Sequence, residues 1–348
     1  MFCRYVVNSL ITKIPLRNIR YVQQRNIEVS VIGAASPIGS NVALLLAQNP
    51  KISRLHLYDD DERVMGIGLE LSYINRGSKV VPFTGENFLP SALRNSNLIL
   101  MVAGTARKLG ISRDQILADN APVLQRLCKT ISNQNPDAIF AISTNPINCV
   151  IPFVSTLMFS YGTYNPYKIC GITHVDTARC RTFVASVLKA SPYYLQVPVI
   201  GGHSEETIVP LFSNIIPSSF CVDACKAEAL TRVLRKASTE VLNHKAGKDS
   251  SVLCMAWSIA EFADRMVTAL CGYESVVNCY SANPHFGTRF FSGPTIVGPR
   301  GIIRVCGNMP MSNFESGLLN NAIPILNKEV CLGENYVQVM ASAGKKSQ

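Results

Sequence analysis

Hydrophobic runs rich in Val and Ile alternate with longer stretches of helical periodicity through the first 150 residues. Residues 28–33 (EVSVIG) predict a strand, residues 38–48 a helix, and residues 55–58 a second strand that ends in three aspartates. Residues 97–103 and 138–143 predict two further buried strands. Strands that alternate with helices in this way indicate an α/β fold, with a parallel sheet and crossover helices.

The second half of the chain loses this regular alternation. It predicts helices over residues 176–189, 222–244 and 250–271, a turn and strand over 191–202, an antiparallel meander at 276–281, 288–291 and 301–305, and a last helix over 311–341. The change of pattern near residues 150 to 171 predicts two continuous domains. We place them at residues 28–171 and 172–342, with residues 343–348 as a tail.

The composition is that of an ordinary globular protein. A chain of 348 residues agrees with two domains, because single hydrophobic cores stop growing at about 250–300 residues. No apolar run approaches the roughly 18 residues of a membrane span, so no membrane association is predicted. The net charge of +10 is not accompanied by a basic cluster interleaved with aromatic residues. A nucleic-acid partner is therefore not predicted either.

Residues 1–27 carry five basic residues and no acidic ones between Val, Leu and Ile. This composition is typical of a mitochondrial transit peptide, and a disordered basic arm is the alternative. The twelve cysteines form no C-x-x-C pair, and no His lies at metal-ligand spacing, so no metal site or disulfide framework is predicted. Free thiols suit a reducing compartment such as the mitochondrial matrix.

The first segment with a chemical signature is the turn at residues 33–39 (GAASPIG). In a dinucleotide-binding fold, glycines here permit a tight turn and a close approach of the backbone to the pyrophosphate. Gly33 and Gly39 fit the outer positions, whereas Ser36 replaces the middle glycine and Pro37 has no N–H to donate. A plain strand-to-helix turn with Pro at the first helical position is the alternative.

Asp59 strengthens the dinucleotide interpretation. It ends the second predicted strand about 20 residues after the last glycine of the turn, where a carboxylate binds both ribose hydroxyls. A carboxylate there repels a 2′-phosphate, so NAD is favoured over NADP. Asp60 and Asp61 are interpreted as solvated turn residues.

Five polar residues stand in otherwise apolar surroundings: Arg107, Arg113, Asp176, Arg179 and His203. A carboxylate, an imidazole and three guanidiniums are the groups needed to hold a dicarboxylic acid and to move a proton and a hydride on it. If these residues converge in space, the protein is an enzyme.

With these motifs in place, the chain resembles malate dehydrogenases of the mitochondrial type, within the lactate and malate dehydrogenase superfamily. The resemblance runs from about residue 28 to 340, and its most specific segments are LYD at 57–59, AGTARKLGISRD at 103–114, NP at 145–146, YNPYKICGITHVDTARCRTFVA at 164–185, VPVIGGH at 197–203 and AIPILNKEV at 322–330. It implies a Rossmann-type doubly wound parallel sheet followed by an α+β substrate domain. It also implies NAD as cofactor, malate and oxaloacetate as substrates, and a homodimer in the mitochondrial matrix.

The resemblance implies a role for each of the five polar residues. Arg179 would bind the C1 carboxylate of the substrate, and Arg107 would bind the distal carboxylate. Relatives that use lactate carry an uncharged residue at the position of Arg107. Arg113 would polarise the C2 oxygen. His203 would take the hydroxyl proton, and Asp176 would hold the imidazole in the required tautomer.

The resemblance also implies the cofactor contacts, which are Gly33, Ser36, Ile38, Gly39, Asp59, Asn120, Ile142, Asn145 and Met255. Asn145 would bind either the substrate C2 oxygen or the cofactor ribose side. Met255 would pack near the nicotinamide, with plain helix core as an equal alternative. Residues 107–111 would form a lid over the substrate, with an ordinary exposed loop as the alternative.

Several positions depart from the family pattern. Ser36 and Pro37 stand where a glycine pair is usual, and Glu205 and Glu206 follow His203 where a glycine and a neutral or basic residue are usual. Three further departures are Leu109 for proline, Ala118 for asparagine and Asp249 for glycine. They leave a second hypothesis open, that the chain is a malate dehydrogenase paralogue of low or no activity with a binding or structural role.

Overall fold

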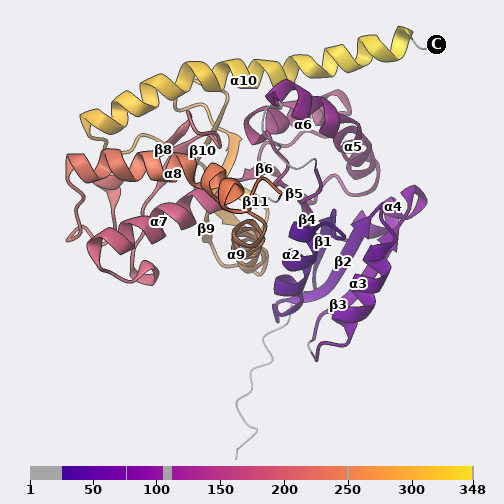
Figure 1. The fold of residues 1–348 in the computed structure, drawn as a ribbon. Coiled ribbons are helices and arrows are strands. Elements are labelled where there is room, and N and C mark those ends of the chain that lie inside the picture. The colour runs from indigo at the N-terminus through magenta and orange to yellow at the C-terminus, as the bar shows by residue number, and fades with distance from the viewer. Residues whose placement is uncertain (1–25, 76, 105–111, 249–250, 347–348) are drawn as a thin grey trace, which may run out of the picture.

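One sheet of 11 strands runs through the whole molecule in the computed structural model, which describes residues 26–75, 77–104, 112–248 and 251–346 (Figure 1). The segment predicted as a transit peptide lies outside these residues, except for its last two positions. No helix in the described part of the chain is long and apolar enough to cross a membrane.

The first six strands are parallel and follow the order β3-β2-β1-β4-β5-β6. They are β1 (Ile27–Ile32), β2 (Ile52–Asp59), β3 (Lys79–Thr84), β4 (Leu98–Met101), β5 (Ile139–Ile142) and β6 (Ile169–Ile172). This order is that of the doubly wound dinucleotide fold, in which ligands bind where the order reverses, outside the carboxyl ends of the strands. The Rossmann-type sheet predicted from the sequence is confirmed, and the reversal lies between β1 and β4.

Helices connect these strands. They are α2 (Pro37–Ala47), α3 (Arg63–Ser72), α4 (Leu89–Leu93), α5 (Arg113–Gln134) and α6 (Ile147–Ser160), with a short 3-10 helix, η2 (Glu86–Phe88). Only α2 was predicted individually, and it begins and ends one residue earlier than expected. Because α5 begins at Arg113 and α6 directly follows Pro146, both helix N-termini lie after carboxyl ends of parallel strands.

The second half adds antiparallel strands to the same sheet. These are β7 (Val199–Gly201), β8 (Ile208–Pro210), β9 (Ser275–Ala282), β10 (Phe290–Gly298) and β11 (Gly301–Arg304). β9 pairs antiparallel with β6, so the sheet continues across the predicted domain boundary. The predicted meander is confirmed as β9, β10 and β11.

Four long helices complete the second half: α7 (His174–Leu188), α8 (Ala224–His244), α9 (Val252–Leu270) and α10 (Asn313–Lys346), with the short η3 (Pro192–Tyr194) and η4 (Phe212–Asn214). All four long helices were predicted, with ends that differ by a few residues. The α/β sheet followed by an α+β half therefore agrees with the expected fold.

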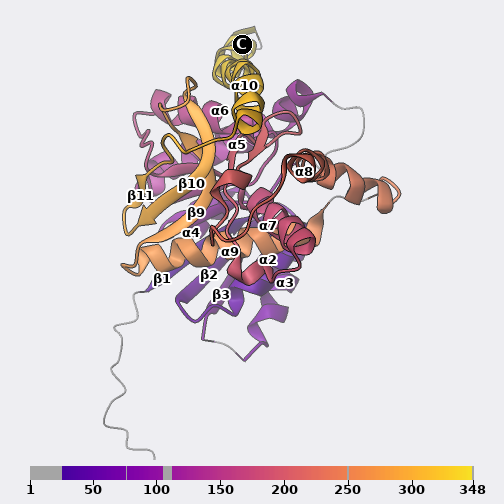
Figure 2. The same cartoon turned by 90° about the vertical axis from the view of Figure 1, so that its left-hand side faces the viewer.

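Helices of the second half cover both faces of the first sheet. On one face, α10 packs along α6, which Figure 1 shows at the top of the molecule. On the other, α9 packs against α2, as Figure 2 shows from the side. A third hydrophobic cluster joins α7, α8 and β7. The two halves are thus packed firmly enough to hold side chains from both in one site.

Candidate active site

His203 and Asp176, two residues of the predicted site, are hydrogen-bonded to each other. The Nδ1 atom of His203 lies 2.6 Å from Oδ2 of Asp176, and both side chains are largely buried, at 11% and 3% exposed. A carboxylate only accepts hydrogen bonds, so this contact assigns the proton to Nδ1 and leaves Nε2 as an acceptor. An imidazole in this state can take a proton from a hydroxyl group.

Local structure explains how the two residues meet. Asp176 lies in the first turn of α7, and His203 stands two residues after the end of β7. The His203 N–H donates to Oδ1 of Asn148 at 2.9 Å, and Asn148 is itself in the first turn of α6. The histidine loop is therefore held from both halves of the chain.

Arg179 follows Asp176 by three residues on α7, so both side chains project from one face of the helix. Its guanidinium donates to Oγ of Ser238 at 2.8 Å and to Oγ of Ser251 at 3.0 Å. Both partners are neutral hydroxyls, so they orient the guanidinium without neutralising it. This arrangement leaves the positive charge of Arg179 available to an anionic ligand.

Arg113 is the first residue of α5 and lies near the histidine loop, but two carboxylates meet it there. Its Nη2 lies 3.3 Å from Oε2 of Glu206, and its Nη1 forms an ion pair with Glu329. Glu206 is 62% exposed, whereas Glu329 is 7% exposed. Glu206, which stands where the family usually has a neutral or basic residue, therefore pairs with the arginine expected to polarise the substrate C2 oxygen.

Asn120 and Asn145 are also brought together. The Asn120 side chain, on α5, donates to the main-chain oxygen of Asn145 at 3.0 Å, after the end of β5. Asn120 is buried and Asn145 is exposed, so the Asn145 amide is available to a ligand at the carboxyl edge of the sheet. Both positions agree with the expected cofactor edge.

The turn at residues 33–39 is tight because two glycines touch other main-chain atoms. A Cβ atom at Gly33, where φ is +92°, would lie 2.5 Å from the nitrogen of Ala103. A Cβ atom at Gly39 would lie 2.0 Å from the oxygen of Gly33. Neither contact is tolerable, so the strand and the helix can approach this closely only with glycine at both positions.

The main-chain donors of this turn are mostly satisfied within the protein. Ser36 caps α2 by accepting from the Gly39 N–H at 3.0 Å and also donates to the Gly33 oxygen at 2.7 Å. Pro37 occupies the first helical position, one residue before the predicted start of the helix, and has no N–H. In this fully described turn, the Ile38 N–H is the donor at the start of α2 that no protein acceptor takes up.

Asp59 ends β2 beside this turn. Its Oδ2 accepts from the Ala35 N–H at 2.8 Å, and its Oδ1 accepts from the Asp61 N–H at 3.1 Å. These bonds hold the carboxylate at the switch point, where a ribose would lie in a dinucleotide fold. A glycine turn, a helix N-terminus and a fixed carboxylate together fit a dinucleotide.

Asp60 was interpreted from the sequence as a solvated turn residue, but the structure gives it two partners. It accepts from the Tyr58 hydroxyl at 2.7 Å and pairs with Arg126. Burial alone would raise the pKa of Asp60, but the bonds from Arg126 and Tyr58 outweigh it and lower that pKa. These residues border a small cavity of about 40 Å³ next to Asp59 and Gly33.

Ile142 and Met255 are the two apolar residues expected near the cofactor. Ile142 ends β5 and is fully buried, so only its main chain could meet a ligand. Met255, on α9, is partly buried and packs against the core cluster that includes α2. The contact of Met255 with the nicotinamide stays a prediction, with plain helix core as its alternative.

Arg107, the lid at 107–111 and Asp249 lie outside the described residues. Among the described residues, no group of three or more His, Cys, Asp or Glu could hold a metal ion. Four partners of the predicted residues were missed by the sequence analysis, namely Asn148, Ser238, Ser251 and Glu329. No local pattern marks them, because each meets its partner across at least 55 residues of sequence.

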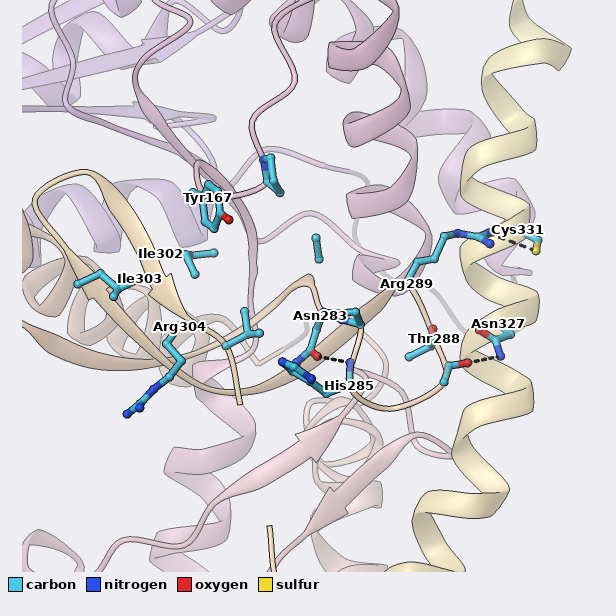
Figure 3. Close-up of a pocket in the computed structure, with 15 residues that line it drawn as sticks. Tyr167, Asn283, His285, Thr288, Arg289, Ile302, Ile303, Arg304, Asn327 and Cys331 are labelled. Atoms are coloured by element: carbon cyan, nitrogen blue, oxygen red, sulfur yellow. Dashed lines mark hydrogen bonds between the residues drawn. The ribbon is translucent and has the colours of Figure 1, made fainter. Parts of the chain in front are cut away.

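The large cavity drawn in Figure 3, of about 920 Å³, lies away from these residues, between the β9–β10 turn, β11 and α10. Several of its polar groups have partners within the protein. Asn327 donates to the Gly287 oxygen at 3.1 Å, the His285 N–H donates to Asn283 at 3.0 Å, and Arg289 pairs with Glu334.

Comparison with known proteins covers both halves of the chain. Residues 27–171 match the family model described as the lactate/malate dehydrogenase NAD binding domain. Residues 173–337 match the model described as the lactate/malate dehydrogenase alpha/beta C-terminal domain. The mitochondrial malate dehydrogenases of Homo sapiens and Sus scrofa are each 36% identical to this chain over 319 residues, which is 91% of this chain and 94% of theirs.

Solved structures share the fold at lower identity. A lactate dehydrogenase from Cryptosporidium parvum, complexed with lactic acid and β-nicotinamide adenine dinucleotide, superposes with a TM-score of 0.76 at 20% identity, covering 89% of this chain and 98% of that one. The malate dehydrogenase of the same organism gives 0.76 at 21% identity, covering 89% and 99%. Because both enzymes share the fold equally, the choice of substrate depends on individual residues of the site.

Proposed function

The chain belongs to the lactate/malate dehydrogenase family of oxidoreductases and uses NAD, and we propose that it is a malate dehydrogenase that interconverts (S)-malate and oxaloacetate. The observation that carries this proposal is the 2.6 Å contact between His203 and Asp176, with Arg179 one turn further along α7. This arrangement supplies an acid/base group and a carboxylate-binding group from adjacent elements.

In the direction of malate oxidation, Nε2 of His203 accepts the proton of the C2 hydroxyl. NAD, when bound, supplies the acceptor for the hydride that leaves C2. Asp176 keeps the proton on Nδ1 and stabilises the cationic imidazole that forms, because its carboxylate is 2.6 Å away and nearly excluded from water. In the reverse direction the same imidazole returns the proton to the C2 oxygen.

Three arginines would bind the substrate. Arg179 takes the C1 carboxylate, for which its two serine partners orient it. Arg113 approaches the C2 oxygen, and Arg107 takes the distal carboxylate. An unpaired guanidinium in a closed site is costly, which would make a substrate with a single carboxylate a poor fit. This requirement favours malate over lactate.

The cofactor would lie across the switch point. The Ile38 N–H at the start of α2 would meet the pyrophosphate, and Asp59 would bind the ribose hydroxyls. Asn120, Asn145 and the main chain of Ile142 would line the nicotinamide side at the carboxyl ends of the strands. Ser36 would donate its hydroxyl to the pyrophosphate, in place of a glycine N–H, only by giving up the hydrogen bond that it makes to the Gly33 oxygen.

A second candidate function, a paralogue of low or no activity with a binding or structural role, is favoured by two contacts. The Gly39 N–H is taken by Ser36, so fewer main-chain donors face the pyrophosphate. Glu206 pairs with Arg113, which places a negative charge where a dianionic substrate must bind. Both contacts would reduce affinity without removing the His203–Asp176 pair.

We also propose a homodimer. Helices α2, α3 and α9 pack side by side, and each leaves large hydrophobic side chains exposed: Leu44, Met65, Leu69, Leu253 and Trp257, at 41–69%. Apolar side chains gathered on neighbouring helices are typical of an interface between subunits. Sedimentation of the protein and of a Leu253→Asp variant would test this, since the variant should be monomeric.

The mitochondrial matrix is the proposed location, because residues 1–27 are basic without acids and the curated relatives named above are mitochondrial. Expression of the chain with a C-terminal fluorescent tag tests this location. A signal spread through the cytosol would contradict it.

The catalytic proposal is tested by NADH oxidation with oxaloacetate, measured by the loss of absorbance of NADH. Turnover should exceed that of a His203→Ala variant by about 100-fold or more, the contribution of a positioned acid/base group. Turnover equal to that of the variant, with NADH binding retained in both, would instead support the paralogue.

A further inference from the structure

Glu329 is a buried carboxylate that the malate dehydrogenase mechanism does not use. It lies in the middle of α10, the helix that packs over α6, and 7% of its side chain is exposed. One oxygen faces Nη1 of Arg113, and the other accepts from the Asn148 side chain at 2.7 Å. A carboxylate so deeply buried is costly unless it is paired and hydrogen-bonded, and both conditions hold here.

Asn148 extends this contact to the acid/base residue. Its Nδ2 donates to Glu329, while its Oδ1 accepts from the His203 N–H at 2.9 Å. Nδ2 also lies 3.3 Å from the hydroxyl of Thr207, which in turn receives the Ser204 N–H at 3.2 Å. The loop that carries His203 is thus tied to Glu329 through one amide side chain.

The two carboxylates on Arg113 differ in what they can do. Glu206 is 62% exposed, so its pairing is screened by water. Glu329 lies on α10 and accepts from Asn148, so the position of the carboxylate that pairs with Arg113 is fixed. A guanidinium with one edge fixed presents its other N–H groups in a predetermined direction.

We propose that Glu329 is a positioning residue, which fixes Arg113 and, through Asn148, the His203 loop so that both groups meet the C2 oxygen of one substrate molecule. This inference rests on the proposed function. It brings α10, which contributes no residue expected to touch substrate, into the control of the reaction. Both ends of the chain of contacts, Arg113 and His203, have a predicted role at the same substrate atom.

The test compares Glu329→Gln with Glu334→Gln, a matched control five residues further along α10. Glu334 also pairs with an arginine, Arg289, but at the surface and away from the site. Gln at position 329 keeps the size and an oxygen that can accept from Asn148, and removes only the charge. We expect kcat/KM for oxaloacetate to fall about 10- to 100-fold in Glu329→Gln, and by less than about twofold in the control.

A double-mutant cycle with Arg113→Gln separates positioning from general stability. If Glu329 acts through Arg113, adding Glu329→Gln to Arg113→Gln should cost less than about threefold, and the KM for NADH should stay unchanged. A loss as large as in the parent protein would overturn the proposal, as would unchanged kcat/KM in Glu329→Gln. Glu329→Asp, which keeps the charge, should recover part of the lost activity.

A binding measurement covers the case in which the parent protein does not turn over. Hydroxymalonate, an unreactive dicarboxylate, is titrated onto the NADH-loaded protein and onto Glu329→Gln and Glu334→Gln. Weaker binding in Glu329→Gln alone, by about tenfold, supports positioning of Arg113 even if the enzyme proposal fails. Equal binding in all three overturns it. Melting temperatures show whether each variant folds. If Glu329→Gln does not fold, Glu329→Asp replaces it, because its shorter side chain withdraws the carboxylate from Arg113, and binding should then weaken less than tenfold but still measurably.

Discussion

The acid/base pair and the cofactor turn differ in the groups that they use, which are side chains in the pair and main-chain N–H groups in the turn. His203 and Asp176 act through side chains, whose 2.6 Å contact requires no particular main-chain N–H group. The turn at residues 33–39 acts through main-chain N–H groups, which depend directly on residue identity. Pro37 has none, and Ser36 consumes that of Gly39. A side-chain site therefore tolerates neighbouring substitutions that a main-chain site does not.

The two regions also differ in how they are anchored. Helix α7, which carries Asp176 and Arg179, is tied to α9 through Glu261, which lies 3.2 Å from His174 and 3.6 Å from Arg181. The turn is held by hydrogen bonds to Asp59 and by close packing of its glycines. Contacts between charged side chains thus hold the helix that carries the substrate-binding residues, whereas main-chain contacts hold the turn that would bind the cofactor.

The largest effect is expected for Asp176→Asn, which keeps the shape of the pair but removes its charge. An amide can donate to Nδ1 and so favour the wrong tautomer, and kcat should fall about 1,000-fold. Steady-state oxaloacetate reduction measures the loss. A fall of less than tenfold would mean that the buried pair is not the acid/base unit. The contrast between a side-chain site and a main-chain site would then no longer hold.

A smaller change, about 100-fold, is expected in the preference for oxaloacetate over pyruvate in Arg107→Gln. The variant loses charge-assisted hydrogen bonds to the distal carboxylate, each worth about 1.5–3 kcal/mol. The ratio of kcat/KM for the two substrates gives the answer. An unaltered ratio would remove Arg107 from the site.

The cofactor turn should respond more weakly and in the opposite direction. Ser36→Gly combined with Pro37→Gly restores an N–H at position 37 and frees that of Gly39, so NADH should bind about tenfold more tightly. Fluorescence titration of NADH measures the affinity, with Ser40→Gly, a partly exposed position further along α2, as control. Equal affinities in the double variant and the parent would show that the altered turn has no bearing on the cofactor.

The smallest effect on turnover is expected from Glu261→Gln, which should alter acid stability instead. Burial raises the pKa of Glu261, but bonds from His174 and Arg265 and the charge of Arg181 outweigh it and hold that pKa at about 2. A lowered folded-state pKa stabilises the protein above the ordinary value near 4.5, and this contribution is lost as the pH falls toward 2. The difference in melting temperature between parent and variant should therefore shrink from pH 5 to pH 2. A constant difference would deny Glu261 its anchoring role.

The elements with the strongest periodicity could be predicted from the sequence. The strand predicted at 28–33 is β1, and the helix predicted at 250–271 is α9, with differences of one or two residues. Others gave too weak a signal. β3 is an edge strand, only partly buried and interrupted by Pro82, and β8 has three residues, too few to show an alternation. α5 and α6 both contain an internal proline, which normally argues against a helix.

The sequence by itself determined the kinds of groups that this protein has for chemistry: an imidazole, a carboxylate, several arginines, and a glycine turn followed by an acidic strand end. These features are local, because residue type and short spacing define them. Only the tertiary structure decided how the groups are paired. Glu329 meets Arg113, Asn148 meets His203, and Ser36 closes on Gly39. Hydrogen bonds and charge pairs act over about 3 Å. Residues far apart in sequence come that close only when the whole sheet and the helices on both its faces have packed.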